Sequence, residues 1–348
     1  MKVGNTEIKV DEIDAASYAK TQRRLDNLTK PLGSLGRLEE IAKEVVAITR
    51  KDKPSIKNKV IFTMAGDHGI CDEGVSAFPK EVTSQMVMNF IHGGAAINVL
   101  AKHVGAKVIV VDMGVALEIK DAPGLVVRKV GLGTKNFAKG PAMTRAEAEK
   151  SVETGINLVM GLDDVDILGT GDMGIGNTTP SAAITAVVTG KSVEEVTGRG
   201  TGIDDKGLEK KIAAIKKGIE VNKPNPKDGL DMLSKIGGFE IGGLAGVIIG
   251  AAMRRKPVVI DGFISAAAAI IAVNIEPKVK GHILPSHMSV EGGHKHALAY
   301  LGKKAIIDFD MRLGEGTGAA LTMNIIEAAC KILTEMATFD SAGVSNKE

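Results

Sequence analysis

The stretch KVIFTMAGD, residues 59–67, decides the fold class of this chain of 348 residues. Between Lys59 and Asp67 it is apolar apart from Thr63, and it has no regular alternation of apolar and polar positions. Such a run is typical of a strand that is buried on both faces, as in a parallel sheet covered by helices. The stretch therefore predicts a parallel strand that ends in a glycine and an aspartate and passes directly into a loop.

The same kind of run recurs along the chain, separated by segments of helix length. This alternation predicts a three-layer α/β/α fold with a Rossmann-like parallel sheet. The further runs that we expect to form strands are AKVIVVDMG (106–114), LVVRKV (125–130), DVDILGTGD (164–172), KPVVIDGF (256–263), GHILPSH (281–287) and AIIDFD (305–310).

The two chain ends have a different pattern. Residues 11–27, 35–50 and 319–338 carry the apolar spacing of helices. We expect these helices to pack together, so that residues 1–54 and 316–348 form a small helical domain. Residues 55–315 then form a large α/β domain that binds the substrates.

Composition narrows the class of protein. The chain has 44 Lys and Arg against 42 Asp and Glu, a formal charge of +2 and only 3% aromatic residues, with no dense basic run, so a nucleic-acid partner is not expected. The first residues contain no apolar signal segment, and no apolar stretch is long enough to span a bilayer. Only Cys71 and Cys330 are present, which argues against a disulfide framework. These features favour a cytoplasmic protein.

Polar or glycine residues stand where several predicted strands end, at Asp67, Asp112, Gly169 and Asp261. In an open α/β sheet, ligands bind at the carboxyl ends of the strands. Each aspartate taken singly is also explained as a cap of a helix or turn. Their accumulation favours a ligand site at this edge of the sheet.

A glycine-rich elbow, GTGDMGIGNTTPSAAITAVV (169–188), follows one predicted strand and opens a helix. Gly169, Gly171 and Gly174 satisfy GxGxxG, the dinucleotide-binding pattern. The elbow lies in mid-chain rather than in the first βα unit, and no lysine follows it as in nucleoside-triphosphate sites. Backbone N–H groups at such a helix start, with the Thr178 hydroxyl, suit a phosphate. A helix cap with tight strand–helix packing is the alternative.

Two further elbows carry chemical groups. GRGTG (198–202) precedes a helix with Lys210 and Lys211, either of which could approach a phosphate or belong to a solvated face. The third elbow, RLGEGTGAAL (312–321), places the lone carboxylate of Glu315 between two glycines. A carboxylate there suits a general base, and the same pattern also suits a cap or packing elbow.

The histidines leave two further possibilities open. His-x-His spacing can supply two zinc ligands, but no cysteine lies nearby and no carboxylate has matching spacing, so we expect no metal. The neighbours Asp67 and His68 suit an acid–base pair or a structural turn. Four of the seven histidines lie in GHILPSHMSVEGGHKH: His282, His287, His294 and His296.

Taken together, the segments resemble the nicotinate-nucleotide–dimethylbenzimidazole phosphoribosyltransferases, in the same order and over nearly the whole chain. The segments that carry the resemblance are TKPLGSLGRLEE (29–40), MAGDHGICDEGVSAFPKEVT (64–83), GPAMTRAEAE (140–149), GIGNTTPSAA (174–183), NKPNPKDGLDMLSKIGGFE (222–240), VIDGF (259–263), PSHMS (285–289) and MRLGEGTGAAL (311–321).

The resemblance implies an enzyme that transfers phosphoribose from β-nicotinate mononucleotide to 5,6-dimethylbenzimidazole. The products are nicotinate and α-ribazole 5′-phosphate, with inversion at the anomeric carbon, in assembly of the nucleotide loop of cobalamin. The general base of the family falls on Glu315. The resemblance also implies a homodimer that needs no metal or cofactor, and a parallel α/β sheet with a small domain from both chain ends.

The resemblance also implies binding residues. The aromatic acceptor is expected against Phe78, Gln85 and Met86, which leave open which benzimidazole, purine or phenol is preferred. Asp172 stands where some relatives have glutamate, which makes it a secondary candidate. The residues expected around the nucleotide and its phosphate are Gly174, Gly176, Asn177, Thr178, Lys211, Ser289 and Gly314.

Two other functions stay open on the sequence. One is an NAD-dependent oxidoreductase that uses the GTGDMG loop. The other is a non-catalytic nucleotide-binding protein that shares the glycine loops.

Overall fold

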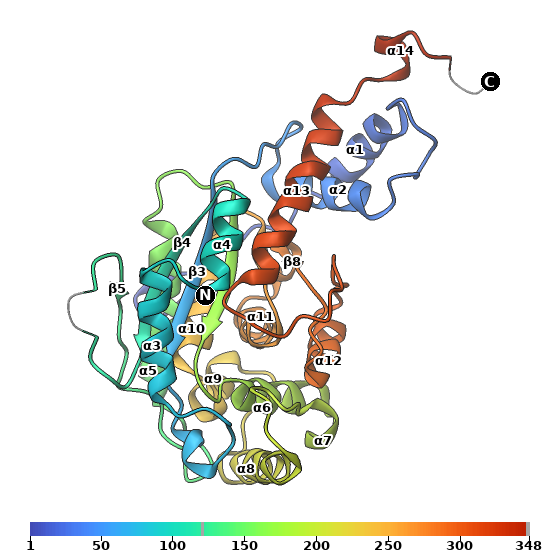
Figure 1. Ribbon diagram of the computed structural model, residues 1–348. Helices are drawn as coiled ribbons and strands as arrows, with labels where there is room; N and C mark the ends of the chain where they lie inside the picture. The colour runs from blue at the N-terminus through green and yellow to red at the C-terminus, as the bar shows by residue number, and fades with distance from the viewer. Residues whose placement is uncertain (120–121, 346–348) are drawn as a thin grey trace.

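The computed structural model describes residues 1–119 and 122–345, and its centre is a six-stranded parallel sheet (Figure 1). The predicted strand at 106–114 is confirmed residue for residue, whereas 125–130 contributes only two residues. In spatial order the strands are β5 (Val126–Val127), β4 (Ala106–Gly114), β3 (Lys59–Gly66), β6 (Ile167–Met173), β7 (Val258–Ile260) and β8 (Ile283–Pro285).

Helices cover both faces of this sheet. Along β3, Phe62 and Met64 point into one hydrophobic core, while Ile61 and Ala65 point into the other. Both faces of a strand must therefore be apolar, which explains the unbroken apolar runs. The three-layer α/β/α prediction is confirmed. One face is covered by α5 (Arg145–Met160), α10 (Phe239–Met253) and α11 (Phe263–Ile275), and the other by α3 (Glu81–Ile91), α4 (Ala96–His103) and α13 (Thr317–Glu335).

The remaining elements surround this sandwich, and several lie beyond the carboxyl ends of the strands (Figure 1). They are η1 (Gly69–Glu73), α6 (Thr178–Thr189), α7 (Val193–Val196), α8 (Asp205–Asn222), α9 (Gly229–Ile236), η2 (Pro277–His282), α12 (Gly292–Leu301) and α14 (Phe339–Ala342). A short antiparallel hairpin of β1 (Lys2–Val3) and β2 (Thr6–Glu7) packs against α5.

The two chain ends meet in helices that project from the body (Figure 1). There α1 (Ala16–Asp26) and α2 (Arg37–Thr49) pack against each other, and α2 packs against α13. Arg24 Nε donates to the Leu333 carbonyl at 2.7 Å. The same helix α13 also packs on β3, β6 and β7. It therefore links the projection to the sheet, and the division into domains at 54/55 and 315/316 stays a prediction.

The predicted strand at 305–310 is wrong. Its only ladder contact among the described residues is an isolated parallel bridge between His287 and Ile307. The N–H groups of Ile306 and Ile307 both donate to the Ser286 carbonyl, and Phe309 is 64% exposed. The segment thus follows the edge of β8 for one residue and then leaves it.

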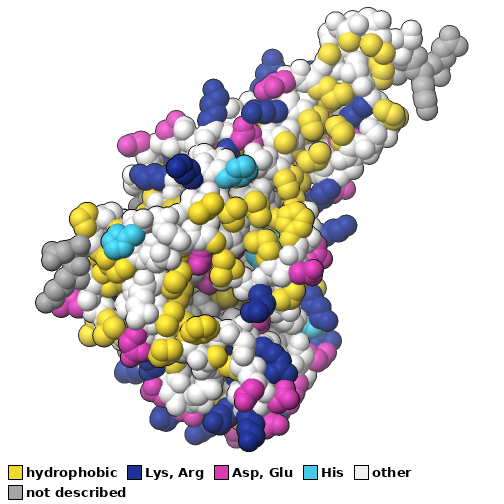
Figure 2. Space-filling view, in the orientation of Figure 1, with side chains coloured by type: hydrophobic (Ala, Val, Ile, Leu, Met, Phe, Trp, Pro, Cys, Tyr) yellow, Lys and Arg dark blue, Asp and Glu magenta, His cyan; other side chains and the backbone are white. Residues whose placement is uncertain are grey.

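The surface carries exposed apolar side chains among mixed charges. Figure 2 shows hydrophobic side chains from the projecting helices to the middle of the visible face. The largest exposed apolar side chains include Leu32 (74% exposed), Leu313 (58%) and Phe78 (52%). No helix in the described part of the chain has both the length and the apolar composition needed to cross a membrane.

Candidate active site

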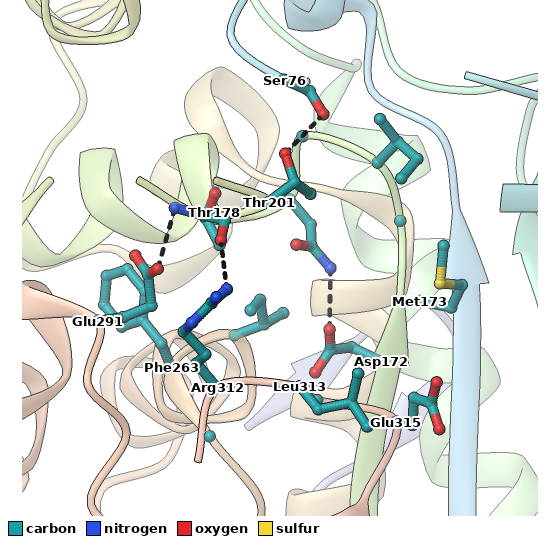
Figure 3. Close-up of a pocket in the computed structure, with 18 of the residues that line it drawn as sticks. Ser76, Asp172, Met173, Thr178, Thr201, Phe263, Glu291, Arg312, Leu313 and Glu315 are labelled. Carbon is teal, nitrogen blue, oxygen red and sulfur yellow. Dashed lines mark hydrogen bonds between the residues drawn. The ribbon is translucent and has the colours of Figure 1, made fainter. Parts of the chain in front are cut away.

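A cavity of about 390 Å³ opens at the carboxyl edge of the sheet, a volume suited to a small-molecule ligand (Figure 3). This is the edge of the sheet at which the strand-end residues predict a ligand site, although none of Asp67, Asp112, Gly169 and Asp261 lines the cavity itself. Its lining comes from the loops after β3, β6, β7 and β8, from α3, from the loop between α7 and α8, and from the segment before α13. The lining residues are Val75, Ser76, Phe78, Val82, Met86, 172–178, Gly200, Thr201, 262–264, His287, Ser289, Glu291 and 312–315.

Glu315 lies on this cavity in a strained turn. Its φ is 64°, and Gly314 and Gly316 on either side have φ of 86° and 100°, a run of left-handed residues that favours glycine. Its carboxylate is buried, and Oε2 accepts the Ile97 N–H at the start of α4 at 3.2 Å. Burial raises the pKa of the Glu315 carboxyl, and the Ile97 N–H partly opposes this. The group is therefore a better base than an exposed glutamate.

Backbone contacts fix the turn that carries Glu315. The Glu315 carbonyl accepts the Thr63 hydroxyl at 2.9 Å, and its N–H donates to the Asp172 carbonyl at 3.2 Å. The turn crosses β6 at Gly171, where a Cβ atom would stand 2.2 Å from the Glu315 carbonyl oxygen. Gly171 is thus required for close approach of the turn, in addition to its place in the GxGxxG pattern.

Asp261, at the end of β7, holds the far side of the same turn. Its Oδ1 accepts the N–H groups of Gly318 at 2.7 Å and Ala319 at 3.2 Å, and its Oδ2 accepts the Gly316 N–H at 3.1 Å. Asp261 therefore caps α13, which is distant in sequence, instead of the helix that follows it directly. Burial raises the pKa of its carboxyl to about 7, although these N–H groups favour the charged form.

The glycine elbow after β6 places polar groups on the opposite side of the cavity. Gly174, Gly176, Asn177 and Thr178 all line it, at the start of α6. No side chain in the described part of the chain caps this helix end. The backbone N–H groups at a helix start carry partial positive charge, so this end of α6 suits an anion.

Lys211 supports this elbow from α8. Its Nζ donates to the Thr178 hydroxyl at 2.7 Å and to the Gly198 carbonyl at 3.1 Å. Burial lowers the pKa of Lys211 to about 8, while the charge of Glu291 opposes the shift. Lys210 is exposed. The structure thus brings Lys211 to the elbow and leaves its neighbour in solvent.

The GRGTG loop closes one side of the cavity through groups that the sequence did not single out. Glu291 Oε1 accepts the Gly200 N–H at 2.9 Å, and Arg312 Nη1 donates to the Gly200 carbonyl at 3.3 Å (Figure 3). Thr201 Oγ1 lies 3.2 Å from the Ser76 hydroxyl. Arg312 lies inside the quoted RLGEG motif, which is the signal that could have identified it. Glu291 has no comparable signal, because its role depends on a contact 91 residues away.

The predicted aromatic slot is partly assembled. Phe78 and Met86 line the cavity together with the apolar side chains of Val75 and Val82. Gln85 is exposed on α3 and does not line the cavity in this structure. Ser289 and Gly314 line it as well. The predicted residues other than Gln85 therefore lie on the cavity or, for Lys211, directly behind it.

The four histidines of GHILPSHMSVEGGHKH are buried or partly buried, and the ring centroids of His287 and His294 lie 6.1 Å apart. His282 is buried in η2, and burial lowers its pKa to about 4. His294 is buried in α12, and its Nδ1 accepts the Ser289 N–H at 2.9 Å. No group of three metal-binding side chains occurs within residues 1–119 and 122–345. His287 lines the cavity.

The pair Asp67 and His68 forms a structural turn. Asp67 Oδ2 accepts the Ala116 N–H at 2.7 Å, whereas His68 Nε2 lies 2.7 Å from Glu240 Oε1. The carboxylate partner of His68 is thus Glu240, which raises the pKa of the histidine against the effect of burial. The acid–base interpretation of Asp67 with His68 is not supported by these contacts.

The GxGxxG pattern does not form a dinucleotide turn. Gly169 and Gly171 lie inside β6, which continues to Met173, so the interpretation of Gly169 as a strand end is wrong. In the Rossmann pattern these glycines belong to the turn between strand and helix. The turn here begins only at Gly174.

The raised pKa of Asp172 can be tested through the pH dependence of stability. It is buried on the cavity, Oδ2 accepts from Asn177 Nδ2 at 2.9 Å, and burial followed by the charge of Asp261 raises its pKa well above the ordinary value. A carboxyl with a raised folded-state pKa binds its proton more tightly when folded. The free energy of unfolding therefore falls as pH rises from the unfolded pKa toward the folded one.

We therefore expect Asp172→Asn to stabilise the protein relative to wild type more at pH 7.5 than at pH 4. The expected difference is at least about 1 kcal/mol, the equivalent of one pKa unit. Urea denaturation of both proteins at the two pH values measures it. Asp163→Asn, at an exposed carboxylate, is the control. An equal effect of Asp172→Asn at both pH values would contradict the buried-acid interpretation.

The parallel sheet, the cavity at its carboxyl edge, the uncapped start of α6 and the buried carboxylate are typical of α/β enzymes that bind a phosphorylated ligand. Comparison with known proteins defines the class further. Residues 10–344 match the family model of the phosphoribosyltransferases, DBI_PRT, and the chain belongs to this family.

The relatives of the chain carry a more specific name. The nicotinate-nucleotide–dimethylbenzimidazole phosphoribosyltransferase of Geotalea uraniireducens (strain Rf4) is 57% identical over 342 residues, covering 98% of this chain and 97% of that protein. The protein of the same name from Roseiflexus sp. (strain RS-1) is 54% identical over 347 residues, with coverage of 99% and 98%. A crystal structure of the enzyme of this name from Thermus thermophilus gives a TM-score of 0.91 at 41% identity, covering 96% of this chain and all of that chain.

These comparisons confirm the resemblance and the fold. The chain is a pentosyltransferase, and the NAD-dependent oxidoreductase finds no support in either the relatives or the position of Gly169 and Gly171.

Proposed function

We propose that this enzyme transfers phosphoribose from β-nicotinate mononucleotide to 5,6-dimethylbenzimidazole, in assembly of the nucleotide loop of cobalamin. The products are nicotinate and α-ribazole 5′-phosphate. The observation that carries the proposal is the buried carboxylate of Glu315, on a cavity that also holds an anion site and an apolar slot. The names of relatives at 54–57% identity support the same reaction.

Glu315 acts as the general base. One ring nitrogen of the benzimidazole attacks the anomeric carbon, and the electron pair of the breaking bond passes to the pyridine nitrogen of nicotinate. The other ring nitrogen carries the proton, which becomes acidic as the new bond forms and passes to the carboxylate. The leaving group begins as a pyridinium and leaves as a neutral ring, so it needs no general acid. Attack opposite the leaving group inverts the anomeric configuration.

The phosphate of the mononucleotide binds at the start of α6. Gly174, Gly176, Asn177 and Thr178 present the helix end, and Lys211 supplies a positive charge beside Thr178. The exposed guanidinium of Arg312 lines the same cavity and adds a second positive charge. Ser289 and Gly314 complete the nucleotide side of the site.

The acceptor lies in the apolar slot of Phe78 and Met86. A flat dimethylbenzimidazole ring buries its methyl groups there, while its N–H faces Glu315 across the cavity. Gln85 joins this slot only if α3 or its side chain moves when the acceptor binds, since it is exposed in this structure.

A chromatographic assay tests the reaction directly. Purified protein is incubated with both substrates, and α-ribazole 5′-phosphate and nicotinate are expected to appear in equal amounts. Neither product is expected when the benzimidazole is omitted. Binding of the mononucleotide without any product in the complete mixture would favour the non-catalytic alternative.

Lys211→Met is expected to weaken binding of the mononucleotide by about 10- to 100-fold, because the positive charge behind the elbow and its charged hydrogen bond to Thr178 are lost. Isothermal titration calorimetry measures the affinity. Since the pKa of Lys211 is about 8, affinity of the wild-type protein is expected to fall as pH rises through 8, and this dependence is expected to be lost in the variant.

The neighbouring Lys210→Met is the matched control, because Lys210 is exposed on the same helix. We expect it to change the affinity by less than about twofold, as is usual for exposed charges. Equal weakening in both variants would show that Lys211 acts only through the overall charge.

We also propose a homodimer in the cytoplasm. The exposed apolar side chains of Leu32 and Leu313 support an interface, and the two unpaired thiols of Cys71 and Cys330 support a reducing compartment. Sedimentation equilibrium is expected to give twice the chain mass of 36.3 kDa. A mass of one chain at all concentrations would contradict the dimer, and recovery from another cell fraction would contradict the compartment.

A further inference from the structure

His287 lines the cavity, and the proposed mechanism gives it no role. Its side chain is 1% exposed. Its Nε2 atom is buried and has no hydrogen-bond partner in the part of the chain that the structure describes. A buried polar atom without a partner costs free energy, so its presence on a cavity wall points to a partner that comes with the ligand.

The protonation of the ring follows from its neighbours. The Ser286 hydroxyl donates its single hydrogen to the Asp261 carbonyl at 2.7 Å. Ser286 Oγ also lies 3.1 Å from His287 Nδ1, where it can therefore only accept. The hydrogen between these two atoms belongs to Nδ1. Asp261 Oδ1, 3.7 Å from Nδ1, favours the same arrangement.

The other ring nitrogen is consequently an acceptor. Burial lowers the pKa of His287, opposed by the charge of Asp308, so the ring is neutral near pH 7. A neutral imidazole with its hydrogen on Nδ1 has a lone pair on Nε2. The free atom of His287 thus requires a donor from the ligand.

The adjacent Gly262 leaves this lone pair open. A Cβ atom at Gly262 would stand 3.4 Å from Nε2 and 3.3 Å from Cε1, and both residues line the cavity. The same residue, Asp261, positions both His287 and Glu315. Its carbonyl accepts the hydroxyl of Ser286, which lies beside His287, and its carboxylate accepts an N–H from the turn of Glu315.

The substrates offer few donors. The nicotinate carboxylate and its pyridinium ring have no N–H or O–H group, and the ionised phosphate is an acceptor. The benzimidazole has one N–H, which faces Glu315 in the proposed mechanism. The ribosyl hydroxyl groups are therefore the donors that remain.

We propose that His287 Nε2 accepts a hydrogen bond from a ribosyl hydroxyl of the donor nucleotide and thereby selects ribonucleotides over deoxyribonucleotides. The inference rests on the proposed function for the identity of the nucleotide. Asp172 Oδ1, also buried and without a partner among the described residues, is a further unsatisfied polar atom on the same cavity. A ribose hydroxyl can both donate and accept, so it can pair with this atom whether or not the carboxyl carries its proton.

The test compares two substitutions that separate the ring nitrogens. His287→Asn keeps an amide near Nδ1 and removes any atom at Nε2, whereas His287→Gln can place its amide oxygen near Nε2. The value of kcat/KM is measured with nicotinate mononucleotide and with its 2′-deoxy and 3′-deoxy counterparts. His296→Asn, at a partly exposed histidine of α12, is the control.

Wild-type enzyme is expected to prefer the ribonucleotide over one of the two deoxy substrates by about 10- to 100-fold, since the deoxy substrate leaves Nε2 unpaired. His287→Asn is expected to remove this preference by slowing the ribonucleotide alone. His287→Gln is expected to restore part of it, and His296→Asn to retain it.

A packing role for His287 would give a different result. The inference is overturned if His287→Asn keeps the wild-type preference, or if it slows all three nucleotides equally. The proposed function fails separately, if wild-type enzyme makes no product from any of them. In that case the affinities of the three nucleotides are measured by calorimetry with wild type and with His287→Asn. The inference is overturned if His287→Asn keeps the wild-type preference for the ribonucleotide, or if it weakens binding of all three equally.

Discussion

Replacing Glu315 with glutamine is expected to lower kcat by about 10³-fold, the usual effect of removing a general base. Glutamine keeps the size of the side chain, and its amide oxygen can still accept the Ile97 N–H that Glu315 accepts at 3.2 Å. The turn should therefore keep its shape, and calorimetric affinity for the mononucleotide should stay within about threefold of wild type. Retention of wild-type kcat would exclude Glu315 as the base.

The pH dependence gives an independent signature of the same group. Burial raises the pKa of the Glu315 carboxyl, and only the ionised form accepts a proton. The wild-type kcat is expected to fall as pH falls through this raised pKa, and the residual activity of Glu315→Gln should lack that limb. Glu335→Gln, at an exposed carboxylate at the far end of α13, the helix that follows the turn of Glu315, should retain both kcat and its decline at low pH.

Replacing Asp261 with alanine is expected to lower the free energy of unfolding by about 4 kcal/mol, because three buried N–H groups lose their acceptor. These are the groups of Gly316, Gly318 and Ala319, at 2.7–3.2 Å from the carboxylate. Urea denaturation measures the loss. Turnover should fall as well, since the same contacts hold the turn of Glu315.

The matched control is Asp166→Ala. Asp166 Oδ2 also accepts two backbone N–H groups, from Lys57 and Asn58 at 2.9 Å each, but these hydrogen bonds are exposed to solvent. Water can replace that acceptor, so we expect a loss below about 1.5 kcal/mol. Equal losses in the two variants would show that burial of the Asp261 contacts adds nothing.

The sequence predicts the central strands because the sheet is buried on both faces, and burial on both faces requires continuous apolar runs. The run at 106–114 forms β4 over its whole length, and 59–67 forms β3 with its last residue in the loop. The run at 305–310 is also mostly apolar, but it fails as a strand. The sequence shows that Ile306 and Ile307 are apolar. It does not show that β8, which lies beside them, is the edge strand of the sheet.

The site is predicted where its residues are close in sequence and missed where they are not. Gly174, Gly176 and Thr178 form one elbow, and Glu315 lies in one turn. The role of Asp261 depends on a contact with Gly318 across 57 residues. The position of Asp261 in the sequence predicts the end of a strand. Only the fold shows that Asp261 caps α13. The sequence shows His287 only as one of four clustered histidines, whereas the acceptor role proposed for its Nε2 atom depends on the hydrogen bond from Ser286 to Asp261.

The path of α13 has a consequence for synthesis. A ribosome delivers the chain in order, so all six strands have been made before the turn of Glu315 and the helix that anchors it. That helix must then find α1 and α2, with Arg24 and Leu333 separated by 309 residues. Contacts of such long separation form late and slowly. A nascent chain that has already folded its sheet therefore still lacks the turn of Glu315, and the contact between its two ends is the last of these to form.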